Sequence, residues 1–155
     1  MFPKTLLALC ALTGSVLLAG GLWLEVGNPA ANPEAKEKGA ALVLRIMACK
    51  SPEKTNITAT AEGIVEGSRR TVALRVIPLS TPGTFAVTRE WPSEGNWAVR
   101  AVATNPEYKD YATGVVVRIE QGGFDRADVK RFYHAPTPTE VDTALRREPE
   151  AVAQR

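Results

Sequence analysis

Hydrophobic and polar residues alternate with a period of two over much of the chain between residues 40 and 134. The clearest stretch, residues 82–104, holds two alternating segments, 84–91 and 96–104, separated by the turn-forming sequence Pro-Ser-Glu-Gly. Alternation on both sides of such a turn predicts an antiparallel hairpin with one buried face. The second segment places Trp97 on that face, so we expect its indole to be almost fully buried.

Five further segments show the same alternation and are bounded by glycine, proline, asparagine or aspartate. They are residues 41–50, 56–66, 70–78, 108–120 and 129–134. In residues 56–66 the alternation slips at Gly63, and a glycine at such a slip predicts a β-bulge. Several short strands joined by turns predict an all-β fold, an immunoglobulin-like antiparallel β-sandwich of about seven strands.

The segments on either side of this predicted domain, residues 40–134, have a different character. Residues 22–39 include a stretch rich in proline, alanine and charge, which predicts a linker. Residues 135–155 are polar and interrupted by proline. Thr139 and Asp142 fit the start of a short helix, but few apolar residues accompany them, so we expect a flexible tail.

The first 21 residues have the pattern of a secretory signal peptide. Lys4 precedes an apolar run over residues 6–18, and small residues follow as far as Gly21. Cleavage after Gly21 predicts an exported protein, periplasmic or secreted. The alternative is an uncleaved membrane anchor, because residues 5–24 are apolar enough to span a bilayer.

Composition limits the classes of function. The chain of 155 residues carries a formal net charge of +2, and this small, scattered excess gives no basis for nucleic-acid binding. A domain of about 100 residues buries roughly two-thirds of its unfolded surface, which is enough for a core without a metal or a disulfide. Cys49 is the single cysteine after the signal peptide, and we expect it to be buried, with intermolecular pairing as the alternative.

Two fragments, residues 82–85 (PGTF) and 94–99 (EGNWAV), resemble the small exported immunoglobulin-like domains of the YtkA/FixH-like kind. The resemblance implies a sandwich whose core contains the tryptophan of the second fragment. Members of that kind are associated with copper or cytochrome-oxidase assembly, so it also implies a metal-handling role as an alternative function. The chain departs from the pattern of that kind, because its predicted domain offers few methionine and histidine ligands.

The candidate metal ligands are Met47, Cys49 and His134. Met47 and Cys49 lie two apart on a predicted strand and therefore share a face, and such soft ligands suit copper. We favour the alternative that these residues lie on an ordinary strand face without a metal, and we expect the protein to have no cofactor. His134 is the only histidine in the chain, which leaves little to orient a serine or cysteine nucleophile. We therefore expect that the protein is not an enzyme, and a hydrolase is the function that we favour least.

Residues 121–128 form a predicted loop in which Phe124 lies among glycines and aspartates. An exposed aromatic residue on a loop often marks a contact surface, although capping of the core is an alternative. Asp125 and Asp128 are too few for a calcium site. We expect a non-catalytic exported binding module that presents Phe124, Asp125 and Asp128 to a protein or extracellular polymer partner, with membrane contact only through an uncleaved N-terminus.

Overall fold

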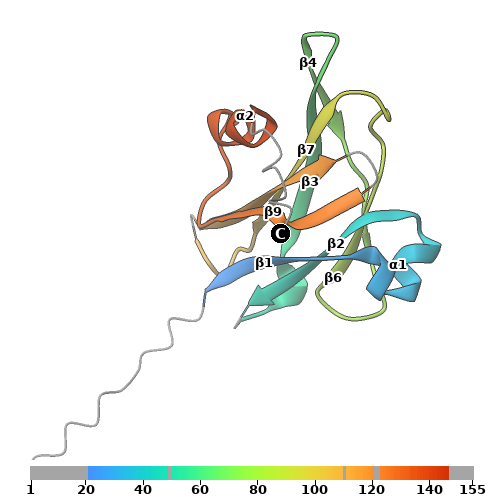
Figure 1. The fold of residues 1–155 in the computed structure, drawn as a ribbon. Helices are drawn as coiled ribbons and strands as arrows, with labels where there is room; N and C mark the ends of the chain where they lie inside the picture. Colours follow the sequence, from blue (N-terminus) through green and yellow to red (C-terminus); the bar gives the residue numbers. More distant parts are fainter. Residues whose placement is uncertain (1–20, 49, 110, 121–122, 147–155) are drawn as a thin grey trace, which may run out of the picture.

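The computed structural model describes residues 21–48, 50–109, 111–120 and 123–146. These residues form an antiparallel β-sandwich, which confirms the predicted fold class (Figure 1). One sheet has four strands in the order β1-β2-β6-β5, and the other has five in the order β4-β3-β7-β8-β9. The first contains β1 (Leu22–Gly27), β2 (Ala40–Ala48), β5 (Val76–Pro78) and β6 (Thr84–Thr88). The second contains β3 (Asn56–Val65), β4 (Ser68–Ala73), β7 (Asn96–Thr104), β8 (Ala112–Glu120) and β9 (Gly123–Phe132).

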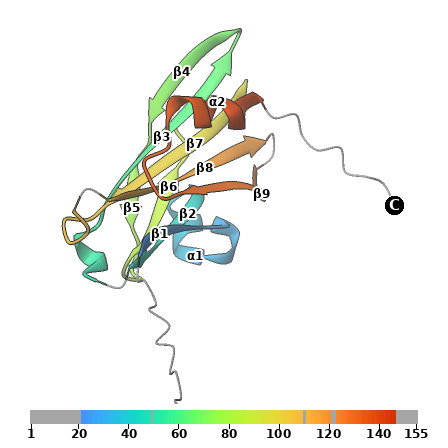
Figure 2. The same cartoon turned by 90° about the vertical axis from the view of Figure 1, so that its left-hand side faces the viewer.

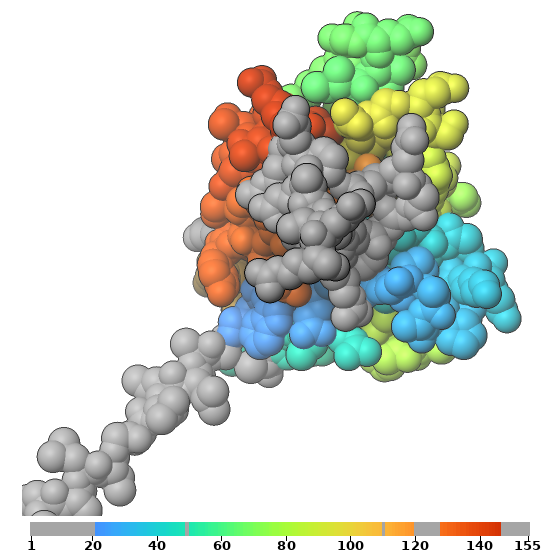
Figure 3. Space-filling model, in the orientation of Figure 1, coloured from blue at the N-terminus to red at the C-terminus, as the bar shows by residue number. Residues whose placement is uncertain are grey.

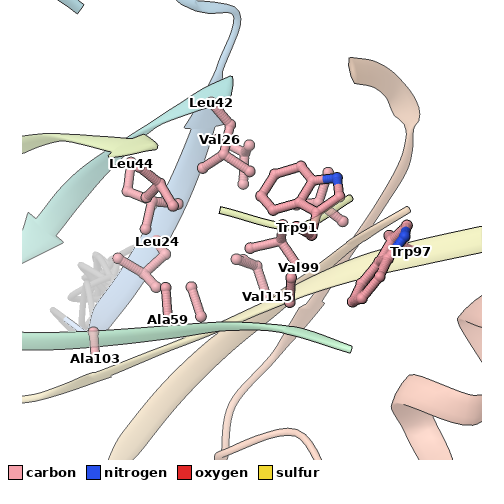
Figure 4. Close-up of a cluster of buried hydrophobic side chains, with 14 of the residues drawn as sticks. Leu24, Val26, Leu42, Leu44, Ala59, Trp91, Trp97, Val99, Ala103 and Val115 are labelled. Carbon is pink, nitrogen blue, oxygen red and sulfur yellow. The ribbon is translucent and has the colours of Figure 1, made fainter. Parts of the chain in front are cut away.

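The core lies between the two sheets and is built from the alternating positions of the strands. Figure 4 shows Leu24 and Leu44 of one sheet facing Val99 and Val115 of the other, with two tryptophans at one end. Trp97 is only 2% exposed, as predicted, and its Nε1 donates a hydrogen bond of 2.7 Å to a backbone carbonyl in the preceding turn. The buried indole therefore has a partner for its single polar group.

The hairpin predicted over residues 82–104 is wrong, because β6 and β7 belong to different sheets. β6 pairs with β2 and β5, whereas β7 pairs with β3 and β8. The connection of residues 89–95 is long enough to cross the ~10 Å between two packed sheets. Both strands still turn one face to the core, so the alternation is the same for a hairpin and for a crossover between sheets.

The strand predicted over residues 70–78 also changes sheets, since β4 pairs with β3 and β5 pairs with β6. The change occurs at Leu74 and Arg75. The Leu74 amide donates to the Ala59 carbonyl of one sheet, and the Arg75 carbonyl accepts from the Thr88 amide of the other. These two residues therefore link the sheets through one backbone hydrogen bond each.

No bulge occurs at Gly63, where the alternation of the sequence slips. β3 and β7 stay in continuous register through this position, and the partner of Gly63 across the strands is Trp97. A Cβ atom at Gly63 would lie 2.5 Å from two ring carbons of Trp97. Gly63 therefore takes an inward-facing position between Ala61 and Val65. It carries no side chain there because the Trp97 indole fills the space.

Residues 22–39, predicted as a linker, belong to the folded domain. β1 pairs with β2, and its Leu22 and Leu24 are 0% and 1% exposed. The chain then forms the short helices η1 (Pro29–Ala31) and α1 (Pro33–Glu37), and a third, η2 (Pro52–Lys54), follows β2. Helix α1 lies beside the outer face of the four-stranded sheet and buries Ala35 there (Figure 1).

Helix α2 (Pro138–Arg146) forms in the first part of the predicted flexible tail, residues 135–155. It packs on the outer face of the five-stranded sheet and buries Val141 and Leu145 (Figure 2). Its start is capped reciprocally, because the Thr137 amide donates to the Glu140 carboxylate over 2.7 Å while the Glu140 amide faces the Thr137 hydroxyl. Few apolar residues are needed, since the sheet supplies the other half of the contact.

Within the described ranges, no helix has the length and apolar character that a bilayer crossing requires. Residues 1–20, which hold nearly all of the predicted signal peptide, lie outside those ranges. Residues 147–155 and Cys49 also lie outside them.

Candidate functional site

The edge strands β1 and β9 meet along one side of the sandwich, near the point where the chain enters β1 (Figures 1 and 3). A cavity of about 350 Å³, here named the seam pocket, opens between them. Its lining residues are Trp23, Leu24, Glu25, Thr113, Arg131, Phe132 and Tyr133.

Two aromatic side chains of the seam pocket are exposed, Tyr133 to 79% and Trp23 to 37%. Trp23 faces outward because its neighbours on β1, Leu22 and Leu24, point into the core. Tyr133 directly follows the last residue of β9. The pKa of the Tyr111 hydroxyl is raised, first by burial and then by its electrostatic interaction with Tyr133.

Arg131 adds a charged group to the seam pocket. It lies opposite Val115 in the β8–β9 register, so it takes an inward position at the open edge of the five-stranded sheet. The Thr113 hydroxyl donates to the Phe132 carbonyl over 2.9 Å and fixes the end of β9 against β8. The pocket therefore combines the exposed aromatic groups of Trp23 and Tyr133 with the charged groups of Glu25 and Arg131.

A second cavity of about 230 Å³, here named the polar pocket, adjoins the first, because Glu25 lines both. Its other lining residues are Val26, Gly27, Asn28, Ala31, Asn32, Val43, Arg45 and Thr84. Glu25, Arg45 and Thr84 are direct partners across β1, β2 and β6. They form a row on the outer face of the four-stranded sheet, since the neighbouring positions of β2 face the core.

The polar groups of this row make few bonds to one another. Glu25 and Arg45 form no ion pair in the part of the chain that the structure describes. The Thr84 side chain is 3% exposed, and its hydroxyl has no hydrogen-bond partner among the described residues. Asn28 and Asn32 use their side-chain oxygens to cap η1 and α1, which leaves the Nδ2 donors of both amides for other partners.

The residues predicted as a contact surface do not lie in a loop. Gly123–Phe132 is the strand β9, in which Phe124 pairs with Ile119 of β8. The polar residues of this segment led to the prediction of a loop, but an edge strand also accommodates such residues because one of its sides is unpaired. Asp128 is half-buried and lines neither pocket, and the side chains of Phe124 and Asp125 lie outside the described part of the structure.

The predicted metal ligands lie in ordinary surroundings where they are described. Met47 is half-buried opposite Trp23 in the β1–β2 register, and Cys49 lies outside the described ranges. The His134 Nε2 atom is 3.1 Å from both carboxylate oxygens of Glu140. The pKa of Glu140 is lowered, mainly by the hydrogen bond from the Thr137 amide. Among described residues, no three His, Cys, Asp or Glu side chains gather as a metal site would require.

Sequence reasoning missed the most prominent residues of both pockets. Trp23 and Glu25 fell in the segment assigned to signal peptide and linker, although Leu22, Leu24 and Val26 alternate with them as in a strand. That short alternation was the available signal. The apolar run of the predicted signal peptide leads directly into this alternation, so the two patterns could not be told apart in the sequence.

Comparisons with known protein families, with curated proteins and with solved structures gave no match to this chain. The two pockets and the sequence pattern are therefore the basis for assigning a function.

Proposed function

We propose that this protein is an exported, non-catalytic binding module that presents the seam of its β-sandwich to a protein or polymer partner. The observation that supports the proposal most directly is the exposure of Trp23 and Tyr133 beside a cavity of about 350 Å³. Exposed aromatic residues around a concave surface are typical of contact sites, because they combine a large apolar area with few rotatable bonds.

The fold leaves the seam between the two sheets open. Each outer face is partly covered by a helix of the same chain, with Ala35 of α1 on one side and Val141 of α2 on the other. At the seam, the edge strands β1 and β9 are accessible as strand edges on which an extended partner can dock.

The chemistry of the seam pocket suits binding better than turnover. Nucleophilic catalysis needs a hydroxyl or thiol held by a base. The Thr113 hydroxyl instead donates to a backbone carbonyl, and its side chain is almost fully buried. Glu25 and Arg131 of the seam pocket can orient a partner through hydrogen bonds.

Export is proposed from the N-terminal pattern, with cleavage after Gly21. Leu22 and Leu24 are core residues of β1, so they cannot lie in a bilayer while β1 is paired. This shortens the candidate membrane span to residues 5–21, the lower limit of the length that crosses a bilayer, which favours cleavage over an anchor. Cell fractionation tests this, and intact full-length protein in the cytoplasm would refute export.

A site-specific cross-link tests the contact surface. A photo-reactive benzoylphenylalanine is placed at position 133 of the full chain in the cells that produce it. The control carries the same group at Ile64, which has a similar exposure to Trp23 but lies on β3. We expect adducts at position 133 that decrease at least tenfold when Trp23→Ala is added. Equal adducts at both positions, or none at position 133, would refute the proposed surface.

A further inference from the structure

We infer that the partner is a neutral, hydroxyl-rich polymer, a glycan, that lies along β1 from the seam pocket into the polar pocket. This inference rests on the proposed binding function and specifies its partner. The two pockets share Glu25, and the surface that they line along β1 is here named the track. A strand rises about 3.3 Å per residue, so the track from Trp23 to Asn28 extends ~17 Å, enough for several sugar rings.

The seam end of the track offers aromatic faces. A pyranose ring has an apolar face of C–H groups, and the electron-rich face of an aromatic ring attracts such groups. Trp23 and Tyr133 are the exposed aromatic residues of the seam pocket. Trp23 lies on β1 and Tyr133 directly follows β9, the edge strands of the two sheets, so a ring seated between them contacts both sheets.

The polar end offers hydrogen-bonding groups of both kinds. A sugar hydroxyl donates one hydrogen bond and accepts others, so it needs donors and acceptors side by side. Arg45, Asn28 and Asn32 supply donors, and the Glu25 carboxylate supplies acceptors. The buried Thr84 hydroxyl lacks a partner among the described residues, which is unfavourable until a ligand supplies one.

The position of these groups distinguishes a glycan from a peptide. A peptide added to the edge of the sheet pairs with the backbone of β1. Arg45 and Thr84 lie on β2 and β6, the second and third strands from that edge, where an added strand does not reach. A polymer lying across the outer face does reach them.

The charges of the track also distinguish a neutral polymer from a charged one. Glu25 lies next to Arg45 on the sheet and lines the seam pocket together with Arg131. Groups of both signs produce no extended field of one sign, which a polyanion or a polycation would need for strong attraction. The same groups hydrogen-bond neutral hydroxyls.

Binding of the full chain to the purified neutral polymers chitin and cellulose is measured by sedimentation, and soluble neutral oligosaccharides are tested on a glycan array and by calorimetry. We expect retention on at least one polymer and at least a tenfold weaker affinity for Trp23→Ala and for Arg45→Gln. Ile64→Ala and Arg70→Gln are the matched controls on β3 and β4, and they should bind as the parent does. Melting temperatures confirm that the variants fold.

Tryptophan fluorescence gives a second readout. Trp91 and Trp97 are buried, so a ligand on the track should change the emission of Trp23, and the change should vanish in Trp23→Phe. The inference is overturned when no neutral glycan binds, or when Trp23→Ala and Arg45→Gln bind as tightly as the parent. A protein adduct at position 133 without glycan binding would refute the glycan and leave the proposed binding function in place.

Discussion

Replacement of Gly63 by alanine adds one methyl group directly beneath the Trp97 indole. The new Cβ atom would lie 2.5 Å from Cδ2 and Cε3 of the indole and 2.9 Å from the Asn96 carbonyl oxygen. Carbon atoms in contact lie about 3.5–4.0 Å apart, so the indole or the strand must move by roughly 1 Å. Overpacking of this kind in a packed core costs about 1–3 kcal/mol of the free energy of unfolding.

The size of the effect should depend on Trp97. In a Trp97→Leu background the rigid ring is gone, and the remaining close approach of the new Cβ is the 2.9 Å distance to the Asn96 carbonyl oxygen. The cost of relieving that approach is offset by the ~0.4–1 kcal/mol that alanine contributes through the unfolded state, so Gly63→Ala should be close to neutral in this background. The coupling free energy of the double-mutant cycle should therefore be about 1–3 kcal/mol.

Urea unfolding followed by far-ultraviolet circular dichroism measures the four free energies, with every protein prepared in the same form. Leucine is used because Trp97→Ala removes about 3–5 kcal/mol, a large share of the stability of a small domain. If Gly63→Ala costs the same in both backgrounds within about 0.5 kcal/mol, the indole does not rest on Gly63 and the assigned packing is wrong.

Three further predictions test the flanking elements. Leu24→Ala should lower the free energy of unfolding by about 2–5 kcal/mol in urea titrations, because β1 is part of the core; an unchanged midpoint would restore the linker interpretation. Gly114→Ala would place a Cβ 2.3 Å from Pro136 Cδ, so it should detach α2 and speed limited proteolysis within the helix, and unchanged cleavage would contradict that contact. Glu140 has a pKa below its ordinary 4.5, first because the Thr137 amide bonds to its carboxylate. The stabilisation that the Glu140 carboxylate contributes is therefore fully present at pH values above its pKa in the unfolded state. It is lost as the pH falls through the lower pKa that Glu140 has in the folded state. Melting curves from pH 7 to pH 3 should show the parent more stable than Glu140→Gln at neutral pH and the difference closing at acid pH, whereas a constant difference would refute this role.

The alternation of the sequence was sufficient to predict the fold class and much of the core. Trp97 and Val99 share a face in the sequence pattern, and both are buried in the structure. Which face of a strand is buried is a local property, since successive side chains point to opposite sides. For the same reason the pattern could not show that β6 and β7 lie in different sheets.

Only the tertiary structure decided the remaining features. Gly63 interrupts the pattern because an indole from another strand fills its place, and α2 needs few apolar residues because a sheet completes its contact. The seam pocket joins Trp23 near the start of the domain to Tyr133 near its end. Local alternation determines burial, but no local pattern contains the pairing of distant strands, because that pairing is set by how the two sheets pack and where their edges meet.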